Sequence, residues 1–181
     1  MARAEQRSVR VTVGMIAAVA AVAMIVSSFL TWVSTPAETG GRTRVSGWGA
    51  ISGASDIAGT NLNDVLQMGG GGSYRPGLLG LIFGGIALVG AAVLLLVRGK
   101  ERPHRITAAV LILCGLVGAG WGVLRVLAPG SAGVLESGDG RAGFGPWLLA
   151  AAGFVLLLVG TAVLAGMLET PEPVRHPGIQ G

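Results

Sequence analysis

The chain has 181 residues, of which 51% are apolar and only 12% are charged. A soluble domain carries about 25% charged residues, so this composition excludes an ordinary water-soluble protein and indicates a membrane protein. The formal net charge of +4 would suit a nucleic-acid ligand, but in a membrane protein the same excess reflects basic cytoplasmic segments.

The first predicted element is a transmembrane helix over residues 11–33, which follows a cytoplasmic N-terminus over residues 1–10. The run contains no charged residue, and about 20 apolar residues in a helix are enough to cross the hydrocarbon layer. Three arginines precede the run and the letters TPA follow it, so a cleavable signal peptide is the alternative. The apolar core of a signal peptide has only about 7–15 residues, so we expect an uncleaved helix.

A long extracytoplasmic loop is predicted over residues 34–76. The letters RVSGWGAIS indicate a short extended segment, and TNLNDVLQMG indicates a short helix with its N-cap at Thr60 or Asn61 and its stop at Gly69. Trp48, in the extended segment, is the candidate contact for a partner protein. Two interpretations of this residue remain open: the indole plugs the mouth of the helix bundle, or it stands out as an anchor for the partner.

Three further apolar runs follow, and each is long enough to cross a bilayer as a helix, because backbone groups in lipid need internal partners. They predict transmembrane helices over residues 77–97, 106–127 and 147–168, a cytoplasmic turn over 98–105, an extracytoplasmic loop over 128–146 and a cytoplasmic tail over 169–181. We therefore predict an all-α membrane protein in which four transmembrane helices pack as a bundle.

Arg125 is the candidate charge at the outer mouth of this bundle. It follows Trp121 by one helical turn, and at this spacing its guanidinium group can lie on the indole ring. Two other interpretations are open. The side chain reaches out to water from the end of the helix, or it forms a buried pair with an outer acid such as Asp64, Glu136 or Asp139.

The distribution of charge predicts the orientation of the chain. The N-terminus, the 98–105 turn and the C-terminal tail together hold eight basic and four acidic residues, whereas the rest of the chain holds five of each. The positive-inside rule then places both termini and the 98–105 turn in the cytoplasm. The membrane that we expect the helices to span is the plasma membrane. The turn has no aromatic residue, so we interpret its basic residues as an orientation signal and not as a nucleic-acid site. The aromatic residues agree, because six of them gather at the predicted outer ends of the helices: Phe29, Trp32, Tyr74, Trp121, Phe144 and Trp147.

The second and fourth apolar runs resemble each other. PGLLGLIFGGIALVGAAVLLL begins at Pro76, and PWLLAAAGFVLLLVGTAVLAG begins at Pro146. One interpretation is a pair of tandem helical hairpins. The other is that all helices made of Leu, Val, Ala and Gly look alike.

Small residues four apart on one helix allow close packing of helix backbones. The candidate packing positions are Gly80, Gly84, Gly118 and Gly122. They would close the bundle or join two copies in a homo-oligomer.

The sequence offers little for catalysis or for holding a cofactor. The interiors of the four apolar runs contain none of the ionisable residues that pumps, transporters and intramembrane enzymes usually need. His104 and His176 both lie beside prolines and have no ligand partner at a suitable spacing, and the single Cys114 lies inside an apolar run. We expect no catalytic residue, no metal and no cofactor.

Several features together resemble small four-span membrane proteins of high-GC Gram-positive bacteria. They are the basic N-terminus, SFLTWVS at Ser28–Ser34, SGW at Ser46–Trp48 and the arginine-rich turn before the third run. The resemblance implies a place in the cell envelope and no enzymatic activity. We expect an accessory or scaffolding subunit that contacts a membrane or envelope protein through its outer loop or a Gly-rich helix face. The alternative is a small oligomeric channel or transporter for neutral or apolar solutes.

Overall fold

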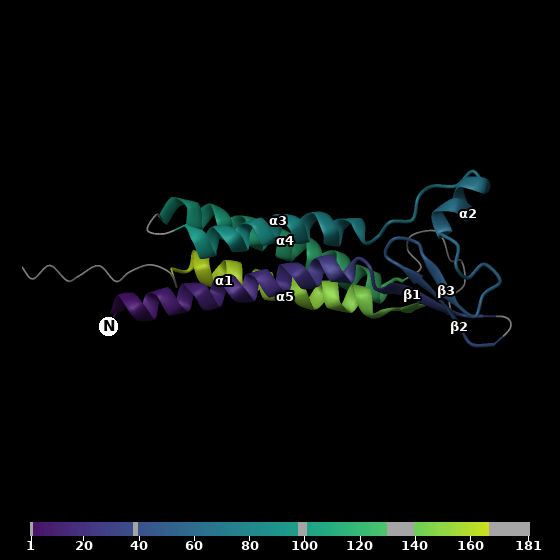
Figure 1. Ribbon diagram of the computed structural model, residues 1–181, viewed down its shortest axis with the longest axis horizontal. Helices are drawn as coiled ribbons and strands as arrows, with labels where there is room; N and C mark the ends of the chain where they lie inside the picture. Colours follow the sequence, from purple (N-terminus) through teal and green to yellow (C-terminus); the bar gives the residue numbers. More distant parts are fainter. Residues whose placement is uncertain (1, 38–39, 98–100, 130–139, 167–181) are drawn as a thin grey trace, which may run out of the picture.

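The computed structural model describes residues 2–37, 40–97, 101–129 and 140–166. In these residues, long helices lie side by side in a bundle, and a small sheet with a short helix covers one end of it (Figure 1). The N-terminus lies at the other end (Figure 1). The bundle consists of α1 (Ala2–Ser27), α3 (Leu78–Leu96), α4 (Glu101–Leu127) and α5 (Phe144–Leu164).

The surface of the bundle is apolar. Four of its segments are long and apolar enough to cross a membrane, namely Ser8–Ser27, Leu78–Leu96, His104–Leu127 and Phe144–Leu164. Large apolar side chains such as Val19, Val89 and Leu158 are exposed on the outside of these helices. Such a surface is stable when lipid covers it, so the helices indicate a multi-pass membrane protein. The predicted four-helix membrane bundle is confirmed.

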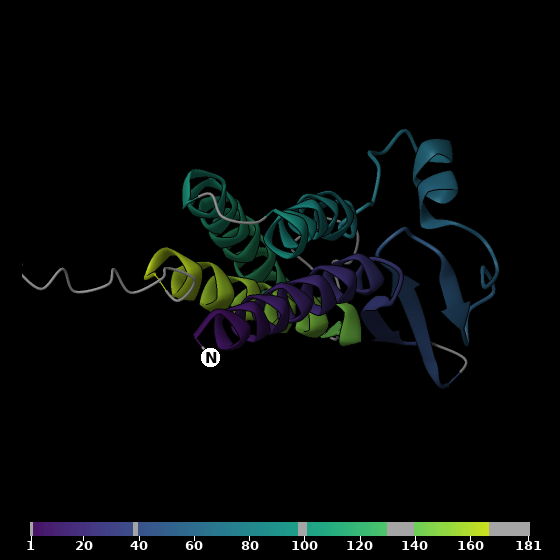
Figure 2. The ribbon, with the colours of Figure 1, turned by 60° about the vertical axis from the view of Figure 1, so that its left-hand side comes forward.

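A sheet at the end of the bundle was not predicted. Its strands are β1 (Thr31–Pro36), β2 (Arg42–Ser46), β3 (Ile51–Gly53) and β4 (Arg141–Ala142). In the described residues they form one antiparallel sheet in the order β3-β2-β1-β4. Because β4 precedes α5 and the other strands follow α1, both connections at this end of the bundle contribute to the sheet (Figure 2).

The short helix predicted in the long loop is confirmed as α2 (Leu62–Met68). Its N-cap is Asn61, whose side-chain oxygen accepts a hydrogen bond from the Asn63 backbone N–H at 2.9 Å. Leu62 and Leu66 pack against a small second core formed by Val45, Ile51 and Tyr74. The helix therefore covers the apolar face of the sheet.

The prediction that the first helix reaches residue 33 is wrong, because α1 ends at Ser27 and Trp32 lies in β1. The hydroxyl groups of Ser27 and Ser28 donate to the Met24 carbonyl at 2.6 and 3.4 Å. The Trp32 indole N–H donates to the Ser27 carbonyl at 2.8 Å, so it satisfies an acceptor that the end of the helix leaves open. After this turn, the β-branched and aromatic residues from Thr31 onward favour a strand.

Other helix ends also differ from the predicted ones. α4 begins at Glu101, inside the segment predicted as a turn, although Pro103 follows. A proline is tolerated in the first turn of a helix, because the N–H groups there have no partner within the helix. α5 runs from Phe144 to Leu164, whereas residues 147–168 were predicted. Gly166 follows its C-cap with φ of 89°, a left-handed conformation that ends helices.

Gly80 and Gly84 lie where α3 packs on α1. A Cβ atom on Gly80 would come within 2.9 Å of the Met24 carbonyl oxygen, and one on Gly84 within 3.0 Å of the Ala21 carbonyl oxygen. The first distance is shorter than real Cβ contacts, and the second would require the backbone of α1 to shift. The two glycines therefore allow the close approach of helices within one chain.

Gly118 and Gly122 lie on the inner side of α4. A Cβ atom on Gly122 would come within 2.7 Å of the Pro146 carbonyl oxygen in α5, while one on Gly118 would meet the tip of the Met24 side chain at 2.6 Å. The most extensive helix contacts are those between α4 and α5, followed by those between α1 and α3. Each of these pairs belongs to one of the two predicted hairpins.

The two hairpins differ in packing at one pair of matching glycines. Gly90 and Gly160 occupy matching positions of the two similar apolar runs. Both lie against α4: Gly90 near Leu111, and Gly160 near the Ala108 carbonyl. For Gly160 this neighbour belongs to its own hairpin, and for Gly90 it belongs to the other one. At this position the sequence match does not extend to matched contacts.

Candidate interaction site at the sheet end of the bundle

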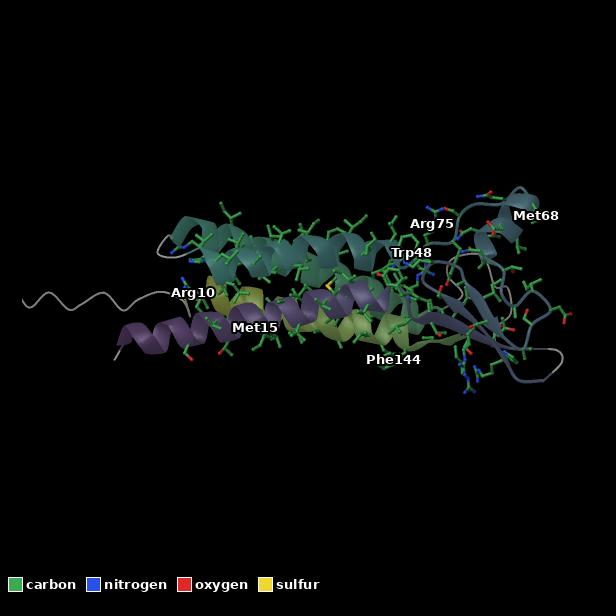
Figure 3. All side chains as sticks on the ribbon, in the orientation of Figure 1. Arg10, Met15, Trp48, Met68, Arg75 and Phe144 are labelled. Atoms are coloured by element: carbon green, nitrogen blue, oxygen red, sulfur yellow. The ribbon has the colours of Figure 1, made fainter. Side chains whose placement is uncertain are left out.

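Trp48 lies on the turn between β2 and β3, where the bundle meets the sheet (Figure 3). Its side chain is half-buried, so the structure supports neither a full plug nor a freely projecting anchor. The ring stacks on Phe29, with centroids 6.0 Å apart and an angle of 25° between the planes. Phe29 is itself 60% exposed. The two rings together form an aromatic surface beside the end of α1.

A polar network holds the backbone of Trp48 in place. Its carbonyl accepts hydrogen bonds from the side-chain amides of Asn61 at 3.3 Å and Asn63 at 3.1 Å. The Asn63 side-chain oxygen accepts a bond from the Tyr74 backbone N–H at 2.6 Å. Gly49, next to Trp48, has φ of 85° and lies against both asparagines. The buried Asn63 thus connects three separate segments at the sheet end of the bundle.

The same turn is tied to the ends of two helices through Gly47. Its N–H donates to the Leu30 carbonyl at 3.2 Å, and its carbonyl accepts from the Gly77 N–H at 3.0 Å. Leu30 follows α1, and Gly77 is the N-cap of α3. A Cβ atom on Gly47 would come within 2.6 Å of the Trp32 indole nitrogen, so no larger residue fits. The position of Trp48 is therefore fixed relative to the bundle.

Arg125 lies at the same end of the bundle and is only 7% exposed. Its guanidinium carbon lies 4.5 Å from the centroid of the Trp121 ring, so the cation rests on the indole and does not extend into water. The Trp121 N–H donates to the Pro76 carbonyl at 3.0 Å, which connects the last turns of α4 to the start of α3. Of the acids proposed as partners, Asp64 is exposed on α2, and Glu136 and Asp139 lie outside the described residues.

Tyr74 lies buried between this cation and the sheet. Burial raises the pKa of the Tyr74 phenol above its usual value, and the nearby positive charge of Arg125 opposes part of the rise. The phenol is therefore neutral at physiological pH. A neutral hydroxyl group next to a cation suits a structural contact better than acid–base chemistry.

A cavity of about 110 Å³ lies beneath the sheet. It is lined by Val33, Thr35, Thr43, Val45, Ile51, Ile57, Leu62 and Tyr74. Sites for small organic molecules have volumes of about 300–1,000 Å³, so this space is too small for a typical substrate. An apolar cavity of this size is usually dry.

The described residues offer no metal site, because no three His, Cys, Asp or Glu side chains lie close enough together to hold an ion. Cys114 is buried in the bundle core, and His104 lies at the opposite end from Trp48. Among the described residues, the arrangement that stands out is the aromatic and polar surface around Trp48.

The sequence analysis did not identify Asn63, Trp32 or Arg141 as residues that build the sheet end of the bundle. Two strands of the sheet nevertheless left a readable signal in the sequence. RTRVS at Arg42–Ser46 alternates arginines with the β-branched residues Thr43 and Val45, as a half-buried strand does. TWVSTP at Thr31–Pro36 is rich in residues that favour strands, but it continues an apolar run and was assigned to the helix.

Comparison with models of known protein families finds no matching family, and no curated protein sequence matches the chain. The resemblance to small four-span envelope proteins therefore stays a prediction.

Proposed function

We propose that this multi-pass membrane protein is an accessory or scaffolding subunit without catalytic activity, and that it contacts a membrane or envelope protein at its sheet end. The observation that carries the proposal is the combination of a rigid backbone and an available aromatic surface at Trp48 and Phe29. Trp48 is held by Asn61 and Asn63, and Phe29 is 60% exposed beside it. Rigid aromatic residues are the usual anchors of protein interfaces, because little conformational entropy is lost when they bind.

The orientation is part of the proposal. The sheet lies at the end of the bundle away from the N-terminus (Figure 1). The excess of basic residues in the N-terminus, the 98–105 turn and the tail supports a cytoplasmic position for the other end. Trp48 would then face an extracytoplasmic or membrane-embedded partner at the plasma membrane.

The alternative of a small channel or transporter has less support. Large apolar side chains fill the centre of the bundle, including Met24, Leu94, Leu111, Leu149 and Leu156, all fully buried. A path for solute would therefore have to form between copies of the chain. Homo-oligomers are compatible with either function.

The test is site-specific photo-crosslinking in native membranes. A photoreactive amino acid replaces Trp48 in one variant and Phe144 in a second, which is exposed at the same end of the bundle. We expect one discrete heterologous product from position 48 and none from position 144. Equal, diffuse labelling from both positions would contradict the proposal, and so would reproducible solute flux through the purified protein in liposomes.

A further inference from the structure

The two faces of the sheet have opposite character. Residues that pair directly in an antiparallel ladder project to the same face. Val33 pairs with Val45 and with Ala142, and Val45 pairs with Ile51. This row forms the apolar face that α2 and Tyr74 cover.

The adjacent row forms the opposite face, and it is basic. Ser34 pairs with Arg44 on one side and with Arg141 on the other, while Pro36 pairs with Arg42. All three arginines are exposed. In the described strands, this face therefore presents three guanidinium groups and no carboxylate. We call Arg42, Arg44 and Arg141 the basic face.

The three cations belong to two segments, distant in sequence, that the fold brings together across β1. Arg42 and Arg44 lie on β2, and Arg141 lies on β4, with Ser34 of β1 between them. The Arg42 side chain donates from Nε to the Ser34 hydroxyl at 2.9 Å, so it leans across the row toward its neighbours. Like charges gathered on one face repel each other. A bound anion removes that cost.

The basic face continues the lipid-facing surface of α5. Arg141 precedes Phe144 by three residues, and Phe144 and Trp147 are 65% and 57% exposed. Exposed aromatic rings at the end of a membrane helix mark the level of the lipid headgroups. Figure 3 shows nitrogen-tipped side chains at the sheet on the same side as Phe144, whereas Arg75 lies on the opposite side of the molecule.

The height of this row above the bundle is also suitable for contact with lipid headgroups. A strand rises about 3.3 Å per residue, so the Ser34 row lies about 10 Å beyond the start of β1. The headgroup layer on each side of a bilayer is about 5–7 Å thick. Arginine side chains at this height reach headgroup oxygens because their long stems can bend back along the protein surface.

We propose that the basic face binds the phosphate groups of anionic phospholipids in the leaflet next to the sheet. A guanidinium group donates two parallel hydrogen bonds to a phosphate, which distinguishes it from a simple positive charge. Contacts from β2 and β4 to the same lipid surface hold the sheet at a defined height and tilt. This role does not depend on a protein partner at Trp48.

The test measures lipid binding by the full-length protein with native mass spectrometry. The wild-type protein is titrated in detergent with phosphatidylglycerol and with phosphatidylcholine. The variant Arg42→Gln, Arg44→Gln, Arg141→Gln removes the basic face. Arg75→Gln and Arg141→Gln form a matched pair, since each removes one exposed outer arginine and only the second belongs to the face. Inorganic phosphate and a soluble glycerophosphodiester are the probes for a phosphate source other than lipid.

A basic residue at an anionic membrane surface contributes about fivefold to binding, so the triple variant should lose at least tenfold in affinity for phosphatidylglycerol. Arg141→Gln should lose about fivefold and Arg75→Gln less than twofold. Affinity for phosphatidylcholine should be lower and should change less among the variants, because its choline cation offsets the charge of the phosphate. The variant with lysine at all three positions keeps the charge and loses the planar guanidinium group, so we expect an intermediate affinity for phosphatidylglycerol. This variant replaces the triple Gln variant if the latter does not fold.

Three results would overturn the proposal. The first is unchanged affinity of the folded triple Gln variant for phosphatidylglycerol. The second is binding of the soluble phosphates as tight as that of the lipid, which would assign the face to a soluble phosphate compound. The third is the loss of a co-purifying acidic protein from the triple variant with no change in lipid binding, which would assign the face to a protein.

Discussion

The helix bundle and the region at its end, formed by the sheet and α2 and called the outer region below, are stabilised in different ways. In the bundle, glycines at the helix crossings let backbones touch, and the core consists of apolar side chains such as Met24 and Leu111. In the outer region, Asn63 and Asn61 join separate segments through hydrogen bonds, and the apolar core is small. Lipid surrounds one part and water the other, and in lipid the tight packing of small residues replaces the hydrophobic effect.

This difference means that a substitution in one region should lower the stability of that region and leave the other region intact. A larger residue at a helix crossing should lower the stability of the bundle as a whole. The loss of a polar side chain in the outer region should loosen that region while the helices stay intact. The predictions below test this separation, starting with the largest expected effect.

Replacing Gly122 by leucine should destabilise the bundle by about 3 kcal/mol or more, because overpacking a rigid interface forces backbones apart. Its Cβ would meet the backbone nitrogen of Ala150 at 2.6 Å. The measurement is the melting temperature in detergent. Gly120→Leu is the matched control, because a Cβ on Gly120 has no neighbour within 4 Å. The melting temperature of Gly118→Leu should lie between those of the other two variants, since the flexible tip of Met24 can move. Equal melting temperatures of the Gly122→Leu and Gly120→Leu variants would show that lipid, not α5, lies against Gly122.

Replacing Asn63 by alanine should destabilise the outer region by about 2 kcal/mol, because the buried Tyr74 N–H loses its acceptor. We expect faster proteolysis within residues 40–74 and an unchanged helical circular dichroism signal. Gln67→Ala is the control, since Gln67 is exposed on the same short helix. If the Asn63 variant lowered the melting temperature of the bundle as much as Gly122→Leu does, the two regions would be one cooperative unit.

The smallest expected effect concerns the protonation of Tyr74, the single tyrosine of the chain. Because its pKa is raised in the folded state, the folded protein holds the phenol proton more tightly than the unfolded chain does. This contribution to stability is present below about pH 10 and is lost as the pH rises through the folded-state value. Absorbance of tyrosinate should give a midpoint above 10 in the native protein and about 10 in denaturant.

The variant Arg125→Gln should raise this midpoint further, because it removes the positive charge that favours the phenolate. A native midpoint at or below the value in denaturant would mean that Tyr74 is not buried next to this cation.

The sequence predicted the bundle well, because long runs without charge have few other stable structures. The outer region was harder to predict for three physical reasons. Residues Thr31–Val33 are apolar enough to pass as the end of a helix, although Trp32 turns back to bond with Ser27. β4 has only two residues and exists because β1 pairs with it. The role of Asn63 depends on segments that are distant in sequence.

The candidate site was predictable only in part. Trp48 was found because it is an aromatic residue in a long outer loop, but its contact with Phe29 depends on where α1 ends. The contact between Arg125 and Trp121 follows from their spacing on one helix. The basic face could not be predicted, because its arginines come from two loops that meet only across β1.

The central claim is that the bundle spans the plasma membrane with the sheet end outside. Cysteine labelling in intact cells tests it most directly, in a background where Cys114 is replaced by alanine. Ser73→Cys lies at the sheet end and Ser8→Cys at the other end, and both positions are exposed. We expect a membrane-impermeant maleimide to label Ser73→Cys in intact cells, and Ser8→Cys only after the cells are permeabilised. Labelling of Ser8→Cys alone, or of both in intact cells, would contradict the account.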